Sequence, residues 1–497
     1  MSAPALPVQS ILGVGRQLSR GSRAAYHAVT RLKAEPHLVR SDLVTGAARS
    51  PRFGGPALAC FAQVTDIHLT DVQSPARFEF INRYHSDPRF RMLLPMQRPQ
   101  EALNAHAVAA MLRTLDAIEA GPVSGSRVEL VVNSGDSVDN VQSNELAAFT
   151  ALFDGGTVRL DSGGAGYQGV QSIGWPDDLA WKPDAGDTPD RFRAALGFPV
   201  HKGLLERALA PFDAQGLRLR WLGCHGNHEE VCQGVGIVTP EMAAWMVGDR
   251  HPLAMPGEID PGQAAELFVT RPEAFTTGPS APVVADPGRH PFTLEDFLGA
   301  NHLAEVDYVH DTSAVRFVVL DTACPGGAAD GCVDARQLEW LQVQLEESGE
   351  RPVVLVTHHG LDSLTNHRPH PAGGAEAVAA ERVLAALNRH FSLVLWLNGH
   401  IHANRVQPRE TFWEVTTSSI VDWPCQARLV ELIDAGRGRL AIACTMVDHD
   451  SPLDPGKAVS SAQMASLHRE LAGNVPGQGF DSNRAGSELD RNVILFR

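Results

Sequence analysis

The chain has 497 residues, of which 43% are hydrophobic and 20% are charged, a composition typical of soluble globular proteins. Its 58 acidic and 42 basic residues give a formal net charge of -16, which disfavours a sequence-independent grip on nucleic-acid phosphates. No window approaches the ~18 consecutive apolar residues of a membrane span, and the basic N-terminus lacks the apolar stretch of an export signal, so we expect a cytoplasmic location, with export as the alternative.

Strand and helix patterns alternate through the first half of the chain. Residues 1–55 lack strong periodicity and are treated as an N-terminal arm. Residues 154–216 and 235–310 are rich in Gly and Pro, and irregular segments of this length are uncommon inside compact domains, so we expect them to form a cap or lid over a site. Between these segments the apolar patterns predict strands over 58–64, 128–132 and 217–222 and helices over 101–120 and 144–153.

The alternation resumes after residue 310. Because strands alternate with helices, the chain is predicted to form an α/β domain over residues 56–450. A polar C-terminal tail follows over 451–497, with one helix at 460–471. The run of strands near the end predicts a second sheet packed on the first. Strands are predicted over 316–320, 352–357, 393–397, 412–417, 427–433 and 439–447, and helices over 375–388 and from an N-cap at Asp334 to Ser348.

Five polar clusters each follow one of the predicted strands. In open α/β sheets, ligands bind at the carboxyl ends of the strands, so we expect these clusters to converge. They hold two Asp, one Asn and four His as possible ligands, with one further His, which is the inventory for two adjacent divalent metals and a proton donor. The clusters are Asp66-Ile67-His68, Gly135-Asp136-Ser137-Val138-Asp139, Gly226-Asn227-His228-Glu229, His358-His359 and Gly399-His400-Ile401-His402.

The spacing within the clusters suits metal ligation. Asp66 and His68 are two residues apart, as are His400 and His402, so a strand end that turns into a loop can direct both members of a pair at the metals. Asp136 carries two carboxylate oxygens, which suit a bridge between ions ~3.5–4 Å apart.

Asn227 offers a neutral amide oxygen next to a Gly. His358 adjoins His359, and the alternation of side chains along a strand directs the two rings to opposite sides. We favour His358 as the ligand. Glu229 is expected to be structural.

Together the five clusters resemble the calcineurin-like metallophosphoesterase superfamily, whose pattern is Asp-x-His, Gly-Asp-x-x-Asp, Gly-Asn-His-Asp/Glu, His and Gly-His-x-His. The resemblance spans residues 66–402 and implies a two-sheet β-sandwich flanked by helices. It also implies two metal sites that share Asp136. By this resemblance the first metal is held by Asp66, His68, Asp136 and His402, and the second by Asp136, Asn227, His358 and His400.

Departures from the superfamily pattern narrow the choice of branch within it. Protein Ser/Thr phosphatases of this superfamily carry Arg after the Gly-Asp-x-x-Asp block, and this chain has Asn140 there. The chain is more similar to the bacterial branch that includes cyclic-nucleotide and other small phosphodiesterases. That branch is broad, so the substrate does not follow from it.

Two metals that share one water lower its pKa from ~15.7 towards roughly 7, so hydroxide is available to attack phosphorus. His228 has no ligand role in the pattern, and we predict that it donates a proton to the leaving group. Asp139 is predicted to hold the other ring nitrogen of His228. Substrate-binding residues are not assigned, although Arg77, Arg83 and His85 either clamp a phosphate or belong to a solvated basic segment.

The sequence therefore predicts a hydrolase of small organic phosphomono- or diesters that uses two divalent metals, with manganese, iron or zinc favoured by nitrogen and oxygen ligands. One alternative is a catalytically inactive phosphoesterase fold that serves as a binding or scaffold module. The other is a nuclease, which needs a basic track. Seven cysteines do not suggest a disulfide scaffold, although local pairing of Cys324 with Cys332, or of Cys224 with Cys232, is an open alternative.

Overall fold

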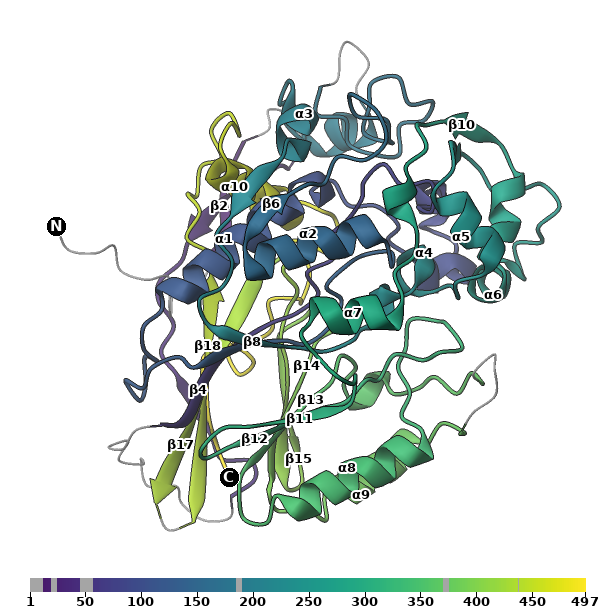
Figure 1. The fold of residues 1–497 in the computed structure, drawn as a ribbon. Coiled ribbons are helices and arrows are strands. Elements are labelled where there is room, and N and C mark those ends of the chain that lie inside the picture. The colour runs from purple at the N-terminus through teal and green to yellow at the C-terminus, as the bar shows by residue number, and fades with distance from the viewer. Residues whose placement is uncertain (1–11, 19–24, 45–56, 185–189, 370–374, 437) are drawn as a thin grey trace.

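The computed structural model describes residues 12–18, 25–44, 57–184, 190–369, 375–436 and 438–497. Two β-sheets face each other at the centre of the molecule, and helices cover the outer face of each sheet (Figure 1). The α/β class and the two-sheet architecture predicted from the sequence are confirmed. No helix in the described ranges is both long and apolar enough to cross a membrane.

The first sheet has seven strands. The inner strand β4 pairs in parallel with β5 and, on its other side, antiparallel with β17. The edge strand β8 is parallel to β5. In spatial order the strands are β3 (Leu38–Arg40), β19 (Val493–Phe496), β18 (Arg439–Asp448), β17 (Gln426–Gly436), β4 (Ala57–Val64), β5 (Leu130–Asn133) and β8 (Arg220–Gly223).

The second sheet has six strands, of which four consecutive neighbours, from β12 to β16, are parallel. In spatial order they are β11 (Tyr308–Asp311), β12 (Arg316–Val319), β13 (Val353–Val356), β14 (Leu393–Asn398), β16 (Phe412–Thr416) and β15 (Arg405–Arg409). The sequence predicted that the late strands build this sheet. That assignment was wrong for β17 and β18, because β17 pairs with β4 and so returns the chain to the first sheet.

Helices pack on both outer faces. Helix α8 begins after Asp334, whose side chain accepts a hydrogen bond from the backbone of Gln337, as the N-cap prediction requires. Helix α9 begins at Ala380 rather than at residue 375, because the preceding residues pair with the segment before α8 through Val378 and Val333. The covering helices are α1 (Asn104–Ala117), α2 (Ser143–Asp154) and α10 (Ser461–Gly473) on the first sheet and α8 (Ala335–Glu347) and α9 (Ala380–Leu387) on the second.

Strand β4 shows how the layers are held together. Ala59 and Phe61 face the core between the two sheets, whereas Cys60 and Ala62 face the core under the helices. Both faces of the strand are covered, so its sequence is a continuous apolar run rather than an alternating one. All seven cysteines are free thiols, so neither of the two local pairs considered from the sequence forms a disulfide.

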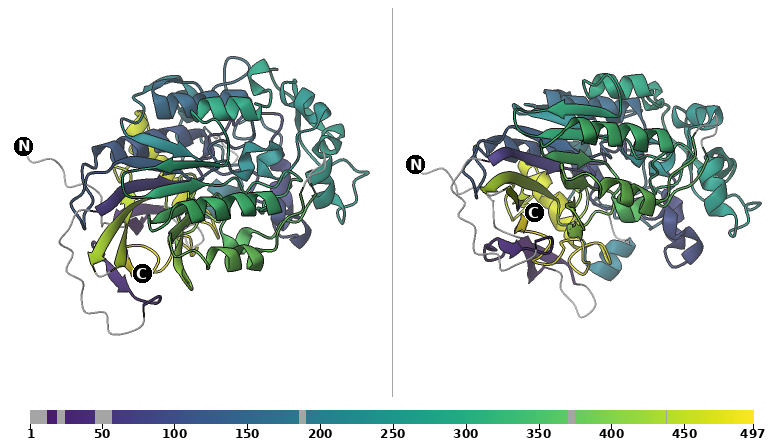
Figure 2. Two further views of the ribbon diagram at one scale, coloured as in Figure 1. Left: turned by 60° about the horizontal axis from the view of Figure 1, so that its bottom comes forward. Right: turned by 90° about the horizontal axis from the view of Figure 1, so that it is seen from below.

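The predicted arm and tail both add structure to this domain. β3 and β19 pair in parallel at one edge of the first sheet, and the purple N-terminal strands lie beside the C-terminus in Figure 2. Tyr26, next to the arm strand β2, is buried and donates a hydrogen bond to Glu470 on α10. The arm also holds a small sheet of β1 (Leu12–Gln17) and β2 (His27–Arg31).

The two predicted cap insertions hold short elements. The first contains β6 (Gly156–Val158), η4 (Phe192–Leu196), α3 (Leu204–Leu209) and β7 (Phe212–Ala214). The second contains α5 (Pro240–Met246), β9 (Arg250–Pro252), α6 (Ala264–Thr270), β10 (Ser280–Pro282) and α7 (Leu294–Ala300). Two short 3-10 helices, η1 (Glu79–Tyr84) and η2 (Pro88–Leu93), follow the first polar cluster.

Candidate metal centre

All five polar clusters lie at strand ends. β4, β5 and β8 of the first sheet deliver the Asp66, Asp136 and Asn227 clusters, and β13 and β14 of the second sheet deliver His358 and His400. The strands of the two sheets therefore bring their carboxyl ends to one place, as expected for ligand binding in α/β sheets.

The backbone is left-handed at five of the seven predicted ligands. The φ angles are 51° at Asp66, 48° at His68, 55° at Asp136, 68° at His400 and 52° at His402. This region costs an L-residue roughly 1–2 kcal/mol, and such strain persists at functional sites where the surrounding structure fixes it.

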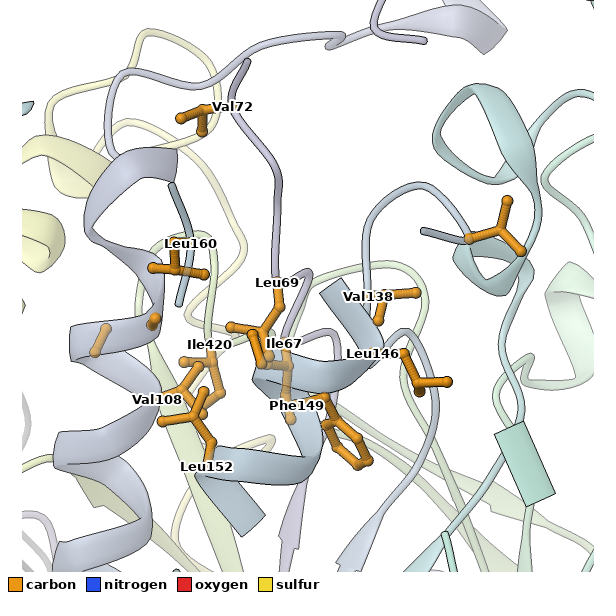
Figure 3. Close-up of a cluster of buried hydrophobic side chains, with 14 of the residues drawn as sticks. Ile67, Leu69, Val72, Val108, Val138, Leu146, Phe149, Leu152, Leu160 and Ile420 are labelled. Atoms are coloured by element: carbon orange, nitrogen blue, oxygen red, sulfur yellow. The ribbon is translucent and has the colours of Figure 1, made fainter. Parts of the chain in front are cut away.

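Apolar neighbours fix these loops. Ile67, Leu69 and Val138 lie between or beside the polar residues and point into the core under α1 and α2 (Figure 3). The Ile67 backbone N–H donates to the carbonyl of Asp136 at 2.9 Å. Each loop thus buries its apolar side chains and turns its polar ones to the opposite side.

The first group of ligand atoms consists of Asp66, His68 and His402. Nε2 of His402 lies 3.2 Å from Oδ1 of Asp66 and 3.1 Å from Nε2 of His68. Oδ2 of Asp136 lies 3.6 Å from the same His68 nitrogen. Atoms this close to one another are within the reach of a single cation.

The second group consists of Asp136, Asn227, His358 and His400. Oδ2 of Asp136 lies 3.1 Å from Nε2 of His358, and Oδ1 of Asn227 lies 3.2 Å from Nδ1 of His400. The carboxylate of Asp136 therefore stands between His68 of the first group and His358 of the second. The structure brings all seven predicted ligands together.

One buried atom tests whether a metal fits here. His358 Nδ1 donates to the Ser134 carbonyl at 2.9 Å, so Nε2 carries a lone pair when the ring is neutral. Nε2 is buried without a hydrogen-bond partner, although it faces an Asp136 oxygen. A lone pair opposite a carboxylate is repulsive unless a cation or proton lies between them. Burial lowers the pKa of His358, but the charge of Asp136 raises it to about 10, so the site favours positive charge at this point.

His359 does not meet the same test. Its Nδ1 lies 2.9 Å from the Thr322 hydroxyl, and its Nε2 lies 2.9 Å from the Ala329 carbonyl. Both ring nitrogens are occupied by the protein, and burial lowers the pKa of the ring. The geometry therefore favours His358 over its neighbour as the ligand.

Two glycines permit the close approach of the loops. A Cβ atom at Gly135, where φ is 101°, would lie 2.6 Å from Nδ1 of His358. A Cβ atom at Gly226 would lie 2.2 Å from Oδ1 of Asp136. Glu229 ties the same loops together, because its carboxylate accepts from the backbone N–H groups of Ser137 and Gly226, both at 2.8 Å. That is the structural role expected for Glu229.

His228 and Asp139 lie next to the first group. Nδ1 of His228 and Nδ1 of His68 each lie 3.2 Å from Oδ1 of Asp139. Burial lowers the pKa of His228, but the charges of Asp136 and Asp139 raise it above the ordinary value. Burial raises the pKa of Asp139, but the Arg77 guanidinium and the two imidazoles hold it well below its usual range. The arrangement favours a protonated His228 beside an ionised Asp139.

Arg77 neither clamps a phosphate nor belongs to a solvated segment, the two alternatives considered from the sequence. Its side chain is fully buried and contacts three carboxylates, with Asp139 at 2.5 Å, Glu101 at 2.8 Å and Glu79 at 3.2 Å. It therefore holds Asp139 from behind and does not reach the cleft. Arg83 is exposed and pairs with Asp177 at 3.9 Å. This agrees with the alternative in which Arg83 belongs to a solvated basic segment.

A small cleft opens beside the predicted metal ligands, with a volume of about 180 Å³. The segment from Met92 to Met96 forms one wall, and two arginines, Arg98 and Arg484, lie beside His402. Among the described residues of the two predicted cap insertions, only Val235 lines this cleft.

Three charged residues at the site, Asp422, Arg98 and Arg484, were not predicted from the sequence. Asp422 accepts from Nδ1 of His402 at 2.7 Å and contacts Arg98 and Arg484. An acidic residue shortly after the strand at 412–416 was a usable signal for Asp422. Arg484 offered none, because it lies in the segment predicted as a polar tail.

No protein-family model matches the chain. The chain is 32% identical over 100 residues to the glycerophosphodiester phosphodiesterase GpdQ of Enterobacter lignolyticus, a match that covers 19% of this chain and 33% of that protein. The chain therefore matches about a third of the length of this curated relative. The match to GpdQ is an observation separate from the order of the five clusters and from their convergence on one point. The chain is therefore similar over 100 residues to a curated phosphodiesterase, and its five clusters resemble the calcineurin-like metallophosphoesterase pattern.

Solved structures overlap this chain at low sequence identity. A dimetal phosphatase from Danio rerio is 12% identical with a TM-score of 0.36, and the overlap covers 79% of this chain and 100% of that one. The sulfate thiohydrolase SoxB from "Termus thermophilus" is 14% identical with a TM-score of 0.28, and the overlap covers 76% of this chain and 54% of that one. TM-scores below 0.5 do not support a residue-by-residue comparison.

Proposed function

We propose that this protein is a metallophosphoesterase that hydrolyses small organic phosphate esters, mono- or diesters, and uses two divalent metals. Nitrogen and oxygen ligands without a thiolate fit manganese, iron or zinc. One metal would be held by Asp66, His68, Asp136 and His402. The other would be held by Asp136, Asn227, His358 and His400. The observation that carries the proposal is the unpartnered Nε2 of His358, which faces the carboxylate shared by the two groups.

When bound, two divalent metals supply Lewis acidity to the phosphoryl oxygens and lower the pKa of a bound water. The chain's own residues supply the proton for the leaving group. Nδ1 of His228 is held by Asp139, which leaves Nε2 as the nitrogen that donates. A protonated imidazole at this position protonates the departing alkoxide, a step that contributes ~10²–10⁴-fold.

Two other functions are less well supported. A binding or scaffold protein does not require a complete ligand set, whereas here all seven side chains that we propose as ligands lie close together, which supports an enzyme. A nuclease requires a basic track for a polymer backbone, and the chain carries a formal net charge of -16.

The proposal is tested by assaying metal-loaded protein against chromogenic phosphate mono- and diesters under manganese, iron and zinc. We expect hydrolysis that is lost on chelation, restored by metal, and reduced by at least ~10³-fold in Asp136→Asn, which removes the shared ligand charge. Asp450→Asn is the matched control, because Asp450 is an exposed partner of Arg113. Metal-loaded protein that cleaves neither ester class would refute the proposal.

A further inference from the structure

Two arginines from outside the five clusters line the cleft. Arg98 follows η2, and Arg484 comes from the C-terminal segment. Both contact Asp422, with Nε of Arg98 at 3.0 Å from Oδ1 and Nη1 of Arg484 at 2.5 Å from Oδ2. Asp422 also holds Nδ1 of His402 at 2.7 Å, so the two guanidinium groups lie one carboxylate away from a predicted metal ligand.

The two guanidinium groups share one carboxylate as their close ion-pair partner. Asp422 is a single carboxylate opposite two guanidinium groups. Glu101 lies 3.9 Å from Nη1 of Arg98, but its other oxygen accepts from Arg77 at 2.8 Å. Within this group of Asp422, Arg98 and Arg484, one positive charge is therefore not matched by a close ion pair of its own, and such a charge attracts anions.

The donors of these arginines are also incompletely used. A guanidinium has five N–H donors in a planar fork that suits phosphate oxygens. Nη1 of Arg484 is buried and lacks an aligned hydrogen-bond acceptor, although it contacts Asp422 as an ion pair. An ion pair without an aligned hydrogen bond leaves donor capacity on this guanidinium that a ligand oxygen can use.

The rest of the cleft is apolar. Met92 and Ile401 are exposed large hydrophobic residues, and with Leu94 and Pro95 they line the same 180 Å³ space as the arginines. This volume admits a phosphate with a short organic group. The wall offers that group dispersion contacts rather than hydrogen bonds.

We propose that Arg98 and Arg484 bind the third terminal oxygen of a phosphomonoester dianion, so that the cleft selects monoesters of small apolar alcohols over diesters. The inference rests on the proposed function and narrows its substrate. In a phosphodiester, an ester group replaces that third oxygen and is a much weaker acceptor. The guanidinium groups then stay desolvated without a partner, a cost that discriminates against the diester.

A purely structural role for the pair, holding Asp422 against His402, predicts something different. Such a role affects both ester classes equally and also affects the metal content. The experiment therefore compares two substrates that share a leaving group, 4-nitrophenyl phosphate and methyl 4-nitrophenyl phosphate, on the metal-loaded full chain. The metal content of each variant is measured in parallel.

In Arg484→Gln we expect kcat/KM for the monoester to fall about 10- to 100-fold, the value of a charge-assisted hydrogen bond, while the diester changes less than about threefold. Arg98→Lys keeps the positive charge, so its kcat/KM for the monoester is expected to fall less than that of Arg484→Gln. Arg405→Gln is the matched control, because Arg405 is an exposed arginine three positions after His402 that pairs with Asp362 at 2.8 Å. Equal losses on both esters, no loss in Arg484→Gln, or a wild-type preference for the diester would overturn the inference.

Binding is measured separately from turnover by calorimetry at pH 8, where inorganic phosphate is a dianion and dimethyl phosphate is a monoanion. Metal-loaded wild type is expected to bind inorganic phosphate at least tenfold more tightly than dimethyl phosphate, and Arg484→Gln to lose most of that difference. Because this arm needs no catalysis, it distinguishes a wrong assignment of the arginines from a wrong assignment of the reaction. Equal binding of the two anions by wild type would contradict the role of Arg98 and Arg484.

Discussion

Replacing Arg77 by Met tests whether this arginine holds the site together or binds substrate. Arg77 is fully buried and contacts Asp139, Glu101 and Glu79 within 3.2 Å. Removing one partner of a buried ion pair costs ~3–5 kcal/mol, because the remaining charge is left uncompensated. Here the carboxylates keep other partners, such as His251 at 2.8 Å from Glu79. We therefore expect a loss of about 3 kcal/mol in the free energy of unfolding, at the lower end of that range.

The assay is urea denaturation of both proteins, with the shift in midpoint multiplied by the common slope. Arg83→Met is the control, because Arg83 is exposed with one ion pair at 3.9 Å and is expected to cost under about 1 kcal/mol. In Arg77→Met, kcat is also expected to fall, because Asp139 loses the contact that holds it against His228. A stability loss below about 1 kcal/mol together with a raised KM and an unchanged kcat would refute this reasoning and return Arg77 to the substrate.

Glu101 adds a pH dependence to the same comparison. Burial raises its pKa to about 7, although Arg77 acts to lower it. A carboxyl whose folded-state pKa is raised contributes stability at low pH that is lost as pH rises through the folded value. Without Arg77 this pKa rises further, so the deficit of Arg77→Met is expected to be larger at pH 8 than at pH 5.5. A deficit that is the same at both pH values would contradict the coupling.

Three further predictions follow from single contacts. His358→Ala is expected to lose one of two bound metals by elemental analysis, whereas His359→Ala, whose ring nitrogens face Thr322 and Ala329, keeps both; the reverse result would exchange their roles. His228→Ala is expected to lower kcat about 100-fold or more for an alkyl phosphate and much less for 4-nitrophenyl phosphate, which needs no proton on its leaving group; equal losses would count against an acid role. Burial lowers the pKa of His106 to about 4 from 6.5, so between pH 7 and pH 5 the unfolded chain takes up a proton that the folded chain does not. Over this range wild type is expected to lose about 2 kcal/mol of stability that His106→Gln keeps. Urea titrations with the same pH dependence in both proteins would contradict this.

The parts of the site that the sequence predicts are those specified by local signals. An apolar run followed by Gly-Asp or Gly-His places the strand, the turn and the polar side chain within a few residues, so Asp136 and His400 were predicted without any tertiary information. Alternation along a strand predicts that His358 and His359 point to opposite sides, but it does not determine which of them faces the site, and His358 is only the favoured choice. The structure then adds a reason that the sequence does not hold, which is the occupation of both His359 nitrogens by Thr322 and Ala329.

The parts that the sequence did not predict depend on pairing between distant segments. The apolar pattern of β17 is the same whichever sheet it joins, and its partner β4 is more than 350 residues away in sequence. Arg484 reaches the cleft because β19 places the C-terminal segment beside β18. Periodicity records which side of a strand is buried and does not record the neighbouring strand.

The parallel pairing of β3 with β19 joins the two ends of the chain. Residues 38–40 are synthesised more than 450 positions before their neighbours at 493–495, so β3 joins the first sheet only after β19 has been made. Until then β18 presents an open edge, and open edges invite pairing with other chains. A message truncated shortly before Val493 would therefore yield a protein that retains every proposed metal ligand and Arg484 yet is prone to aggregate.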